Sequence, residues 1–428
     1  MSKSQTHKPQ AASRRKMLKG LVGLAGGALA YSGFSRATEN HLAEGRKPAV
    51  DDLQTTQAEQ QAQAFYGTHQ SGIVTAQQAN AAIVAFDVLA VDKAGLQALF
   101  KILTQRSDFL MSGGKAPSRN DKYPPLDSGM LGPYIHPDNL TITVSVGASL
   151  FDERFGLSDL KPSQLMTMTQ FPNDGLQSEW CHGDLLIQFC ANSADTTLHA
   201  LRDIIKHTPA YLSVKWRRDG FISPHAAASQ GRRTPINLLG FRDGTVNPPN
   251  QPEVVNRMLW VNSRNEPKWA HGGSYQVVRL IRFFVEHWDR TPLQEQEAIF
   301  GRHRDTGAPI GKRHEHDDPD YQSDPKGQRI LLGSHMRRAN PRTEGMPEYL
   351  LLRRSYSYSY NTALNGQLDV GLLFIGYQAD LMTGFIATQG RLNGEELEEY
   401  IKPFGGGYYF ALPGVKQGEY LGQKLLET

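Results

Sequence analysis

The chain has 428 residues, 39% of them hydrophobic and 21% charged, which favours a globular protein with more than one domain. Its net charge of +3 depends on residues 1–37, which carry seven Lys and Arg and no acid. Without them the net charge is 3 − 7 = −4, so the remaining chain is a poor candidate for nucleic-acid binding. The two cysteines, Cys181 and Cys190, exclude a disulfide framework and a thiolate iron–sulfur site, and we expect both to be buried thiols.

The N-terminal segment has the pattern of a twin-arginine export signal. Arg14 and Arg15 precede an uncharged, Gly- and Ala-rich run at 20–34 that is too short to span a bilayer comfortably, and Met17 stands where the motif usually has Phe. Cleavage is expected near Ala37, with Ala30 as a second choice, and an uncleaved membrane anchor is the alternative. Because this route exports folded proteins, we expect a periplasmic or secreted protein without a stable membrane anchor after cleavage.

Beyond the signal, residues 38–62 lack apolar periodicity and are expected to form a leader or exposed arm. The apolar pattern then predicts two similar halves. In the first half, strands are predicted at 81–90, 140–150, 184–191 and 212–221, and helices at 93–104 and 193–206. In the second half, strands are predicted at 275–286, 349–356, 371–378 and 408–412, and helices at 291–301 and 394–402.

Each half therefore follows the order β-α-β-β-α-β, the split βαβ arrangement. We expect an α+β fold of two ferredoxin-like domains, whose antiparallel sheets carry their helices on the outside. The predicted division is a signal at 1–37, an arm at 38–62, an N-terminal domain at 63–228 and a C-terminal domain at 229–428. The loop at 302–333 is unusually long, and loops of this length in a compact domain are functional or disordered.

Asp243 lies between glycines in the string GFRDGT at 240–245. Because Asp-Gly pairs are common in turns, a simple turn is one interpretation. The glycines also allow the backbone to approach a flat ligand closely, so a binding site is the second interpretation.

His335 opens the string HMRRANPR at 335–342, in which three arginines follow a histidine. Heme iron commonly takes a histidine ligand, and guanidinium groups pair with carboxylates such as the heme propionates. A basic loop that binds RNA or phosphate is the alternative. Arg353 follows in an apolar stretch, where a charge is costly unless it has a partner or a function. Its neighbour Arg354 is expected to face the opposite side of the strand, toward solvent.

Two further groups have more than one interpretation. The run HEHDD at 314–318 could bind a transition metal or form a solvated loop. Tyr356, Tyr358 and Tyr360 alternate along one predicted strand and are expected to pack on one face. These tyrosines could instead carry oxidising equivalents to the surface, together with Trp260, Trp269 and Trp288.

From about residue 64 onward, the chain resembles the dye-decolourising peroxidases. The resemblance rests on FYGTHQSGI at 65–73, HGDLL at 182–186, GFRDGT at 240–245, TGAP at 306–309, HMRRANPR at 335–342, LLF at 372–374 and YQ at 377–378. The export signal and the length are similar to those of the secreted branch described as deferrochelatase/peroxidase. The resemblance implies two ferredoxin-like domains, with heme b bound in the C-terminal one, which agrees with the duplicated pattern.

The resemblance also implies a role for each matching residue. His335 is implied as the proximal ligand of the heme iron, Asp243 as the distal acid–base and Arg353 as the distal arginine. The heme-lining positions that it implies are Gly244, Thr245, Val246, Asn340, Pro341, Arg342 and Arg353. Some branches carry Asn two residues after the distal arginine, where this chain has Ser355, so a mechanism that relies on that Asn does not transfer.

The implied activity is reduction of hydrogen peroxide at ferric heme, with oxidation of an organic donor. Asp243 would move a proton between the peroxide oxygens, Arg353 would stabilise negative charge, and an Asp base predicts activity that extends to acidic pH. One alternative is a deferrochelatase that releases iron with the tetrapyrrole intact. Another is a non-catalytic heme carrier, which would need His335 alone. The implied partners are hydrogen peroxide, an unknown reductant, iron-uptake components and a second copy of the chain in a dimer.

Overall fold

The computed structural model describes residues 61–347, 349–363 and 365–428. The predicted export signal and most of the predicted arm lie outside these residues. No helix among the described residues is long and apolar enough to cross a membrane.

Nine strands form one antiparallel sheet. In chain order they are β1 (Asn80–Val88), β4 (Thr141–Gly147), β5 (Leu185–Ala191), β6 (Leu212–Phe221), β7 (Ser274–Phe283), β8 (Leu352–Arg353), β9 (Tyr356–Thr362), β10 (Leu368–Gln378) and β11 (Ile401–Ala411). A separate pair, β2 (Gly114–Lys115) and β3 (Tyr134–Ile135), makes a small hairpin.

The strand order contains the same arrangement twice. The first half has the order β4-β5-β1-β6, and the second has β11-β7-β10-β9, with β8 beside β10. Both are the order of a ferredoxin-like sheet, so the expected fold of two such domains is confirmed. The halves join where β11 pairs with β4 and where β6 meets β9, so that eight of the strands close into a ring.

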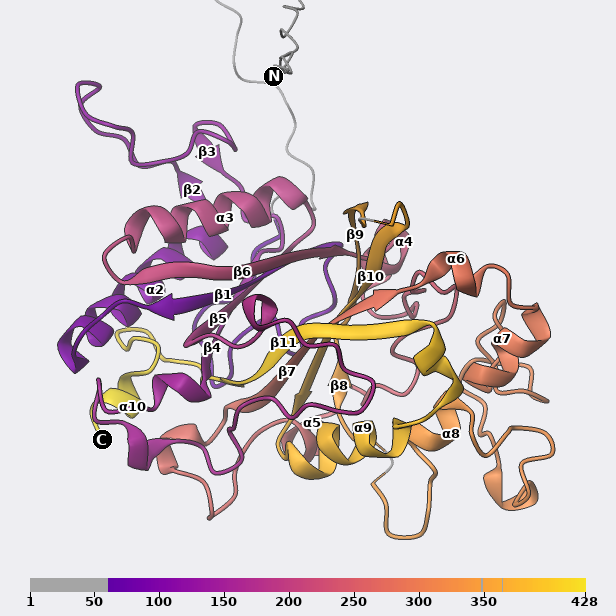
Figure 1. Cartoon of the computed structure of the whole chain (residues 1–428). Helices are drawn as coiled ribbons and strands as arrows, with labels where there is room; N and C mark the ends of the chain where they lie inside the picture. The colour runs from indigo at the N-terminus through magenta and orange to yellow at the C-terminus, as the bar shows by residue number, and fades with distance from the viewer. Residues whose placement is uncertain (1–60, 348, 364) are drawn as a thin grey trace, which may run out of the picture. The chain divides into compact units, whose positions relative to one another are not determined.

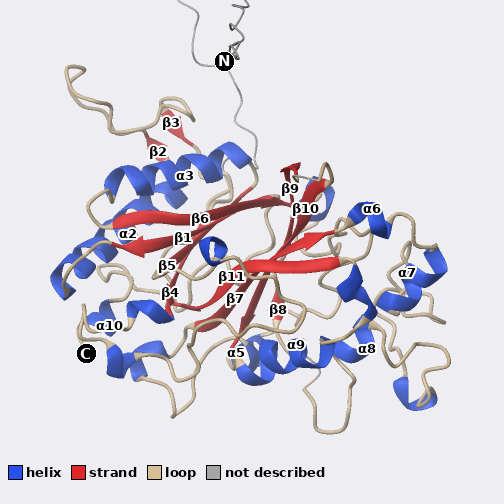
Figure 2. Ribbon diagram, in the orientation of Figure 1, coloured by secondary structure: helices blue, strands red, loops and turns tan. Residues whose placement is uncertain are grey.

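The helices lie outside this ring (Figures 1 and 2). The first half carries α2 (Lys93–Ser112) and α3 (Ala194–His207), and α4 (Pro224–Ala228) follows β6. The second half carries α5 (Pro252–Met258), α6 (Val285–Trp288), α7 (Leu293–Phe300), α8 (His335–Ala339), α9 (Ala387–Leu392) and α10 (Gln423–Leu426). Helix α2 begins where the Asp92 carboxylate accepts a hydrogen bond from the Gly95 N–H at 2.8 Å, and it ends at Gly113, whose φ is +71°.

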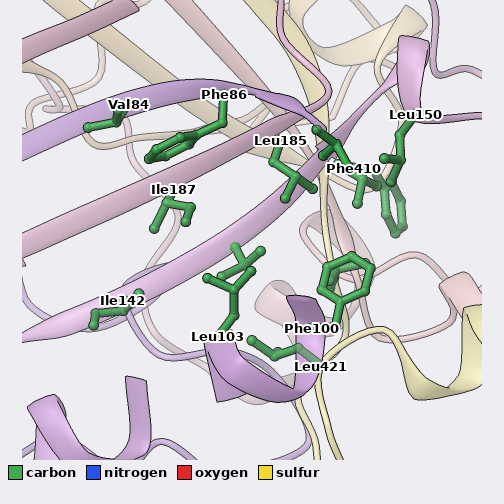
Figure 3. Packing of buried hydrophobic residues seen from close by; sticks show 14 of the residues in the cluster. Val84, Phe86, Phe100, Leu103, Ile142, Leu150, Leu185, Ile187, Phe410 and Leu421 are labelled. Carbon is green, nitrogen blue, oxygen red and sulfur yellow. The ribbon is translucent and has the colours of Figure 1, made fainter. Parts of the chain in front are cut away.

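Three buried clusters hold the fold together. Figure 3 shows the first, in which Val84, Phe86, Ile142, Leu185 and Ile187 of the sheet lie near Phe100 and Leu103 of α2. The second cluster includes Ile83, Trp216, Leu280 and Tyr377, which come from strands of both halves. The third surrounds Phe241, Trp288 and Tyr400 in the second half. Cys181 and Cys190 are free and buried, as expected.

Two predicted elements are wrong, and both lie in the second half. The strand predicted at 349–356 is replaced by the two-residue β8 and by β9, which starts at Tyr356. The helix predicted at 394–402 is absent: the chain makes a short 3-10 turn at Glu396–Glu399 and enters β11 at Ile401. Pro403 disfavours helical backbone in the residue before it, and pairing of β11 with β7 provides an alternative for this segment.

The expected exposure of Arg354 is also wrong. Arg354 is buried and donates hydrogen bonds to the Thr75 carbonyl and the Gln78 side chain. It lies in the break between β8 and β9, where the alternation of a continuous strand does not determine which side a residue faces.

Candidate active site

His335 is the first residue of α8 and is fixed by a buried carboxylate. Its Nδ1 lies 2.8 Å and 3.0 Å from the two carboxylate oxygens of Glu395, whose side chain is only 4% exposed. A carboxylate in this position accepts the Nδ1–H and leaves the Nε2 lone pair free for a metal. The ring of Phe300 packs edge-on against the imidazole, with 5.8 Å between ring centroids. Glu395 does not stand out in the sequence, because it is one of several acids in a segment predicted as a helix.

The arginines after His335 do not act together. Arg337 donates to the Asp324 carboxylate at 3.3 Å and to the Ile330 carbonyl at 2.9 Å. Arg338 donates to main-chain carbonyls at the end of α9, at 2.8 Å and 2.6 Å. These two guanidinium groups therefore anchor α8 to its surroundings, and they have protein partners in place of a ligand.

Asp243 and Arg353 come together in the structure. The Asp243 Oδ1 lies 3.2 Å from the Arg353 Nη1, and their side chains are 12% and 29% exposed. The turn that carries Asp243 uses left-handed backbone at Gly240, where φ is +86°, and at Gly244, where φ is +120°. The interpretation as a turn is therefore confirmed, and the carboxylate also has a charged partner, whereas a ligand-binding role of the string stays a prediction.

Asn247 links the Asp243 turn to the strand that carries Arg353. Its side-chain oxygen accepts from the Arg353 N–H at 2.9 Å, and its amide nitrogen donates to the Arg353 carbonyl at 2.7 Å. This paired contact joins positions 106 residues apart. It fixes the backbone of Arg353 relative to the turn, a role that the sequence analysis did not assign to Asn247.

The long loop at 302–333 contacts both parts of the site. Glu315 accepts from the Thr245 hydroxyl at 2.9 Å, and it lies 3.4 Å from the Arg242 Nε. Asp318 of the same loop pairs with Arg342, which follows α8, at 3.0 Å. The loop thus connects the Asp243 turn with the segment that follows α8.

No group of three or more His, Cys, Asp or Glu side chains that could hold a metal ion exists within residues 61–347, 349–363 and 365–428. The run at 314–318 is therefore not a metal cluster in this structure. Glu315 faces Thr245, and the Asp317 carboxylate accepts main-chain N–H groups of its own loop.

The remaining heme-lining candidates lie on two segments. Gly244, Thr245 and Val246 follow Asp243 and are partly buried. Asn340, Pro341 and Arg342 follow α8, where the Arg342 N–H donates to the Asn340 Oδ1 at 3.3 Å.

The tyrosine stripe lies on β9 beside a cation. Tyr356 and Tyr358 are buried, whereas Tyr360 is 48% exposed. The Arg218 guanidinium lies 4.8 Å from the centroid of the Tyr358 ring and 4.3 Å from that of Tyr360. A cation over these rings opposes removal of an electron from them, so the proposed path for oxidising equivalents receives no support from this contact.

The donor chemistry of the site suits heme. His335 offers an imidazole nitrogen and has a carboxylate at its other ring nitrogen, which is a common way to orient a histidine ligand. Arg302, Arg342 and Arg353 bring positive charge to the same region, which favours an anionic ligand; Arg302 is the most buried of them, at 9% exposure. The residues present therefore fit the group that the resemblance implies.

Comparison with known proteins gives a consistent result. Residues 70–222 match the family described as Dyp-type peroxidase, N-terminal, and residues 234–416 match Dyp-type peroxidase, C-terminal. The chain is 58% identical over 421 residues to a protein named deferrochelatase from Yersinia pseudotuberculosis, covering 97% of this chain and 95% of that one. It is also 58% identical over 423 residues to a deferrochelatase from Escherichia coli O157:H7, covering 97% of each.

Solved structures show the same similarity. A DyP-type peroxidase from Cellulomonas bogoriensis aligns with a TM-score of 0.78 at 33% identity, covering 87% of this chain and all of that one. Ferric DtpA from Streptomyces lividans aligns with a TM-score of 0.77 at 32% identity, with the same coverage.

Proposed function

The chain belongs to the Dyp-type peroxidase family, and on this premise we propose that it is a heme-dependent peroxidase that reduces hydrogen peroxide and oxidises an organic donor. The observation that carries the proposal is the Asp243–Arg353 pair, together with a histidine held by a buried carboxylate. A heme carrier would need only the histidine. The carboxylate–guanidinium pair is what proton transfer on a bound peroxide requires.

The cofactor assigned to the site is heme b. His335 would bind the iron through Nε2, while Glu395 holds the Nδ1–H. When bound, heme supplies the iron at which peroxide is reduced. The residues proposed to line it are Gly244, Thr245, Val246, Asn340, Pro341, Arg342 and Arg353.

Asp243 is the proposed acid–base. Its carboxylate would accept a proton from one peroxide oxygen and deliver it to the other, which contributes about 10²–10⁴-fold in related proton transfers. Arg353 would orient this carboxylate, from which it lies 3.2 Å away, and would stabilise negative charge on the departing oxygen. Asn247 would maintain both positions by holding the Arg353 backbone.

Replacement of Asp243 by Asn tests the assignment. We expect Asp243→Asn to lower peroxidase turnover by at least about 10²-fold, because the amide cannot accept the proton. The visible absorption band of the bound heme should remain, since His335 and Glu395 are unchanged. Glu344→Gln, at an exposed position, is the matched control. Turnover that survives in Asp243→Asn would remove Asp243 from the mechanism.

A second activity, release of iron from heme with the tetrapyrrole intact, is favoured by the deferrochelatase relatives, whose similarity extends over nearly the whole chain. The test is incubation of the purified protein with hemin under reducing conditions. Fluorescence of metal-free protoporphyrin would support iron release, and breakdown of the ring or unchanged heme would contradict it. His335→Ala should abolish the fluorescence if the activity uses the same site.

The location and assembly of the protein are proposed from the sequence. The twin-arginine pattern supports export of the folded chain to the periplasm or beyond, with iron uptake as its physiological setting. The proposed domains are 63–228 and 229–428, after a signal at 1–37 and an arm at 38–62. A homodimer is proposed as well, and light scattering of the exported protein would test it.

A further inference from the structure

We propose that Arg302 is a carboxylate-binding residue of the heme site, which holds a propionate of the bound tetrapyrrole. This inference rests on the proposed function, because it assigns a role toward heme to a residue that neither the sequence analysis nor the resemblance selected. It is carried by the burial of Arg302, by its incomplete set of partners and by the charges around it.

Arg302 is buried and only partly satisfied. Its Nη1 donates to the Gly307 carbonyl at 2.6 Å and to the Glu315 carbonyl at 2.9 Å. Both acceptors are neutral main-chain groups. Within the part of the chain that the structure describes, no carboxylate forms an ion pair with Arg302. Its Nε and Nη2 have no protein acceptor within these residues and are not among the fully buried unpaired atoms, so they remain accessible to a ligand.

The surroundings of Arg302 are short of negative charge. Burial is the largest cause that lowers the pKa of Arg302 to about 10; the nearby charges of Arg353 and Arg342 also lower it, whereas Tyr321 and Glu315 raise it. The group still carries its charge at neutral pH. A buried cation in such surroundings is costly unless an anion lies beside it.

Three other arginines of this region already have anionic partners. Arg342 pairs with Asp318, Arg353 with Asp243 and Arg337 with Asp324. Arg302 has no such partner among the described residues and is buried, so a ligand would supply the missing charge. Hydrogen peroxide is neutral at physiological pH, whereas the tetrapyrrole carries two carboxylates.

The geometry suits a carboxylate in particular. A guanidinium presents parallel N–H donors that match the two oxygens of a carboxylate. The two carbonyl contacts at Nη1 hold the group in place before the ligand arrives, so little conformational freedom would be lost on binding. The loop that supplies Gly307 and Glu315 also contacts the Asp243 turn through Glu315, which connects propionate binding to the catalytic side.

The test compares two ligands that differ only in their carboxylates. Heme-free protein, as wild type and as Arg302→Gln, is titrated with hemin and with hemin dimethyl ester, and binding is followed by the heme absorption band. Arg304→Gln is the matched control, because Arg304 is an exposed arginine of the same loop. Arg302→Lys keeps the positive charge but lacks the forked donors of a guanidinium. Thermal unfolding of each heme-free variant checks that the variant is folded.

We expect Arg302→Gln to weaken hemin binding about tenfold or more and to leave binding of the ester unchanged, with Arg302→Lys between wild type and Arg302→Gln. Equal weakening for both ligands would mean that Arg302 only supports the loop, and this result would overturn the inference. Unchanged hemin affinity in Arg302→Gln would overturn it too. Those failures differ from failure of the proposed function, in which wild type would bind neither ligand.

Discussion

The contact between Glu395 and His335 predicts a measurable shift in the reduction potential of the bound heme. The carboxylate of Glu395 is 4% exposed and accepts the Nδ1–H at 2.8 Å. Glu395→Gln preserves the shape of the side chain and removes the charge. A charge-assisted hydrogen bond contributes about 1.5–3 kcal/mol, and a neutral one about 0.5–1.5 kcal/mol, so the change removes about 1–1.5 kcal/mol.

The lost interaction favours ferric heme over ferrous heme, because a negative carboxylate stabilises the higher charge on the metal. At 59 mV for each tenfold change in a one-electron equilibrium, the loss corresponds to a rise of about 40–60 mV in potential. Spectroelectrochemical titration of the loaded protein measures this directly. Glu396→Gln, at the exposed neighbouring position, should leave the potential unchanged. A potential that does not move in Glu395→Gln would refute the idea that this carboxylate acts on the metal through His335.

Three other predictions follow from described contacts. Asn247→Ala removes both hydrogen bonds to the Arg353 backbone. It should lower the free energy of unfolding by about 1–2 kcal/mol, measured by urea unfolding, and turnover by about tenfold, measured by steady-state kinetics, with hemin affinity retained. Asp174→Asn leaves the charge of Arg279 buried without its partner and should cost about 3–5 kcal/mol in urea unfolding; a loss below about 1 kcal/mol would contradict this. Burial lowers the pKa of His69 below its usual 6.5, so the unfolded chain binds the proton more readily than the folded chain. His69 should therefore reduce the stability of the fold as the pH falls below about 6.5. Thermal melts at several pH values should show a weaker loss of stability in acid for His69→Gln.

The fold could be predicted from the sequence where the local pattern and the tertiary environment agree. The run at 81–90 is apolar because β1 lies between two neighbouring strands and is buried on both faces. Strand β6 begins and ends at the predicted residues, 212 and 221. The duplicated order of elements was enough to identify two ferredoxin-like halves.

The predictions were wrong where tertiary contacts outweigh local preference. The acidic run at 395–399 has the composition of a helix, but Gly394 has a φ of +74° and the chain soon joins β7 as β11. The same segment contains Glu395, which contacts His335 although the two residues are 60 positions apart in the sequence. Nothing in the local sequence distinguishes this carboxylate from its exposed neighbours.

The candidate site was only partly accessible to sequence reasoning for the same reason. Asp243, His335 and Arg353 stood out because each has an unusual neighbourhood in the chain. Asn247, Glu315 and Arg302 are ordinary polar residues until the fold brings them to their partners. Their roles come from geometry, which composition and spacing do not encode.

The closed ring of strands has a consequence for how the chain is made. Strand β11 is the last strand in the sequence, yet it pairs with β4 from the first half. Until Ala411 has left the ribosome, β4 and β7 each have an exposed edge that could pair with another chain. Closure of the ring of strands is therefore a late event in biosynthesis. A chain truncated before β11 should aggregate, because the edges of β4 and β7 stay unpaired.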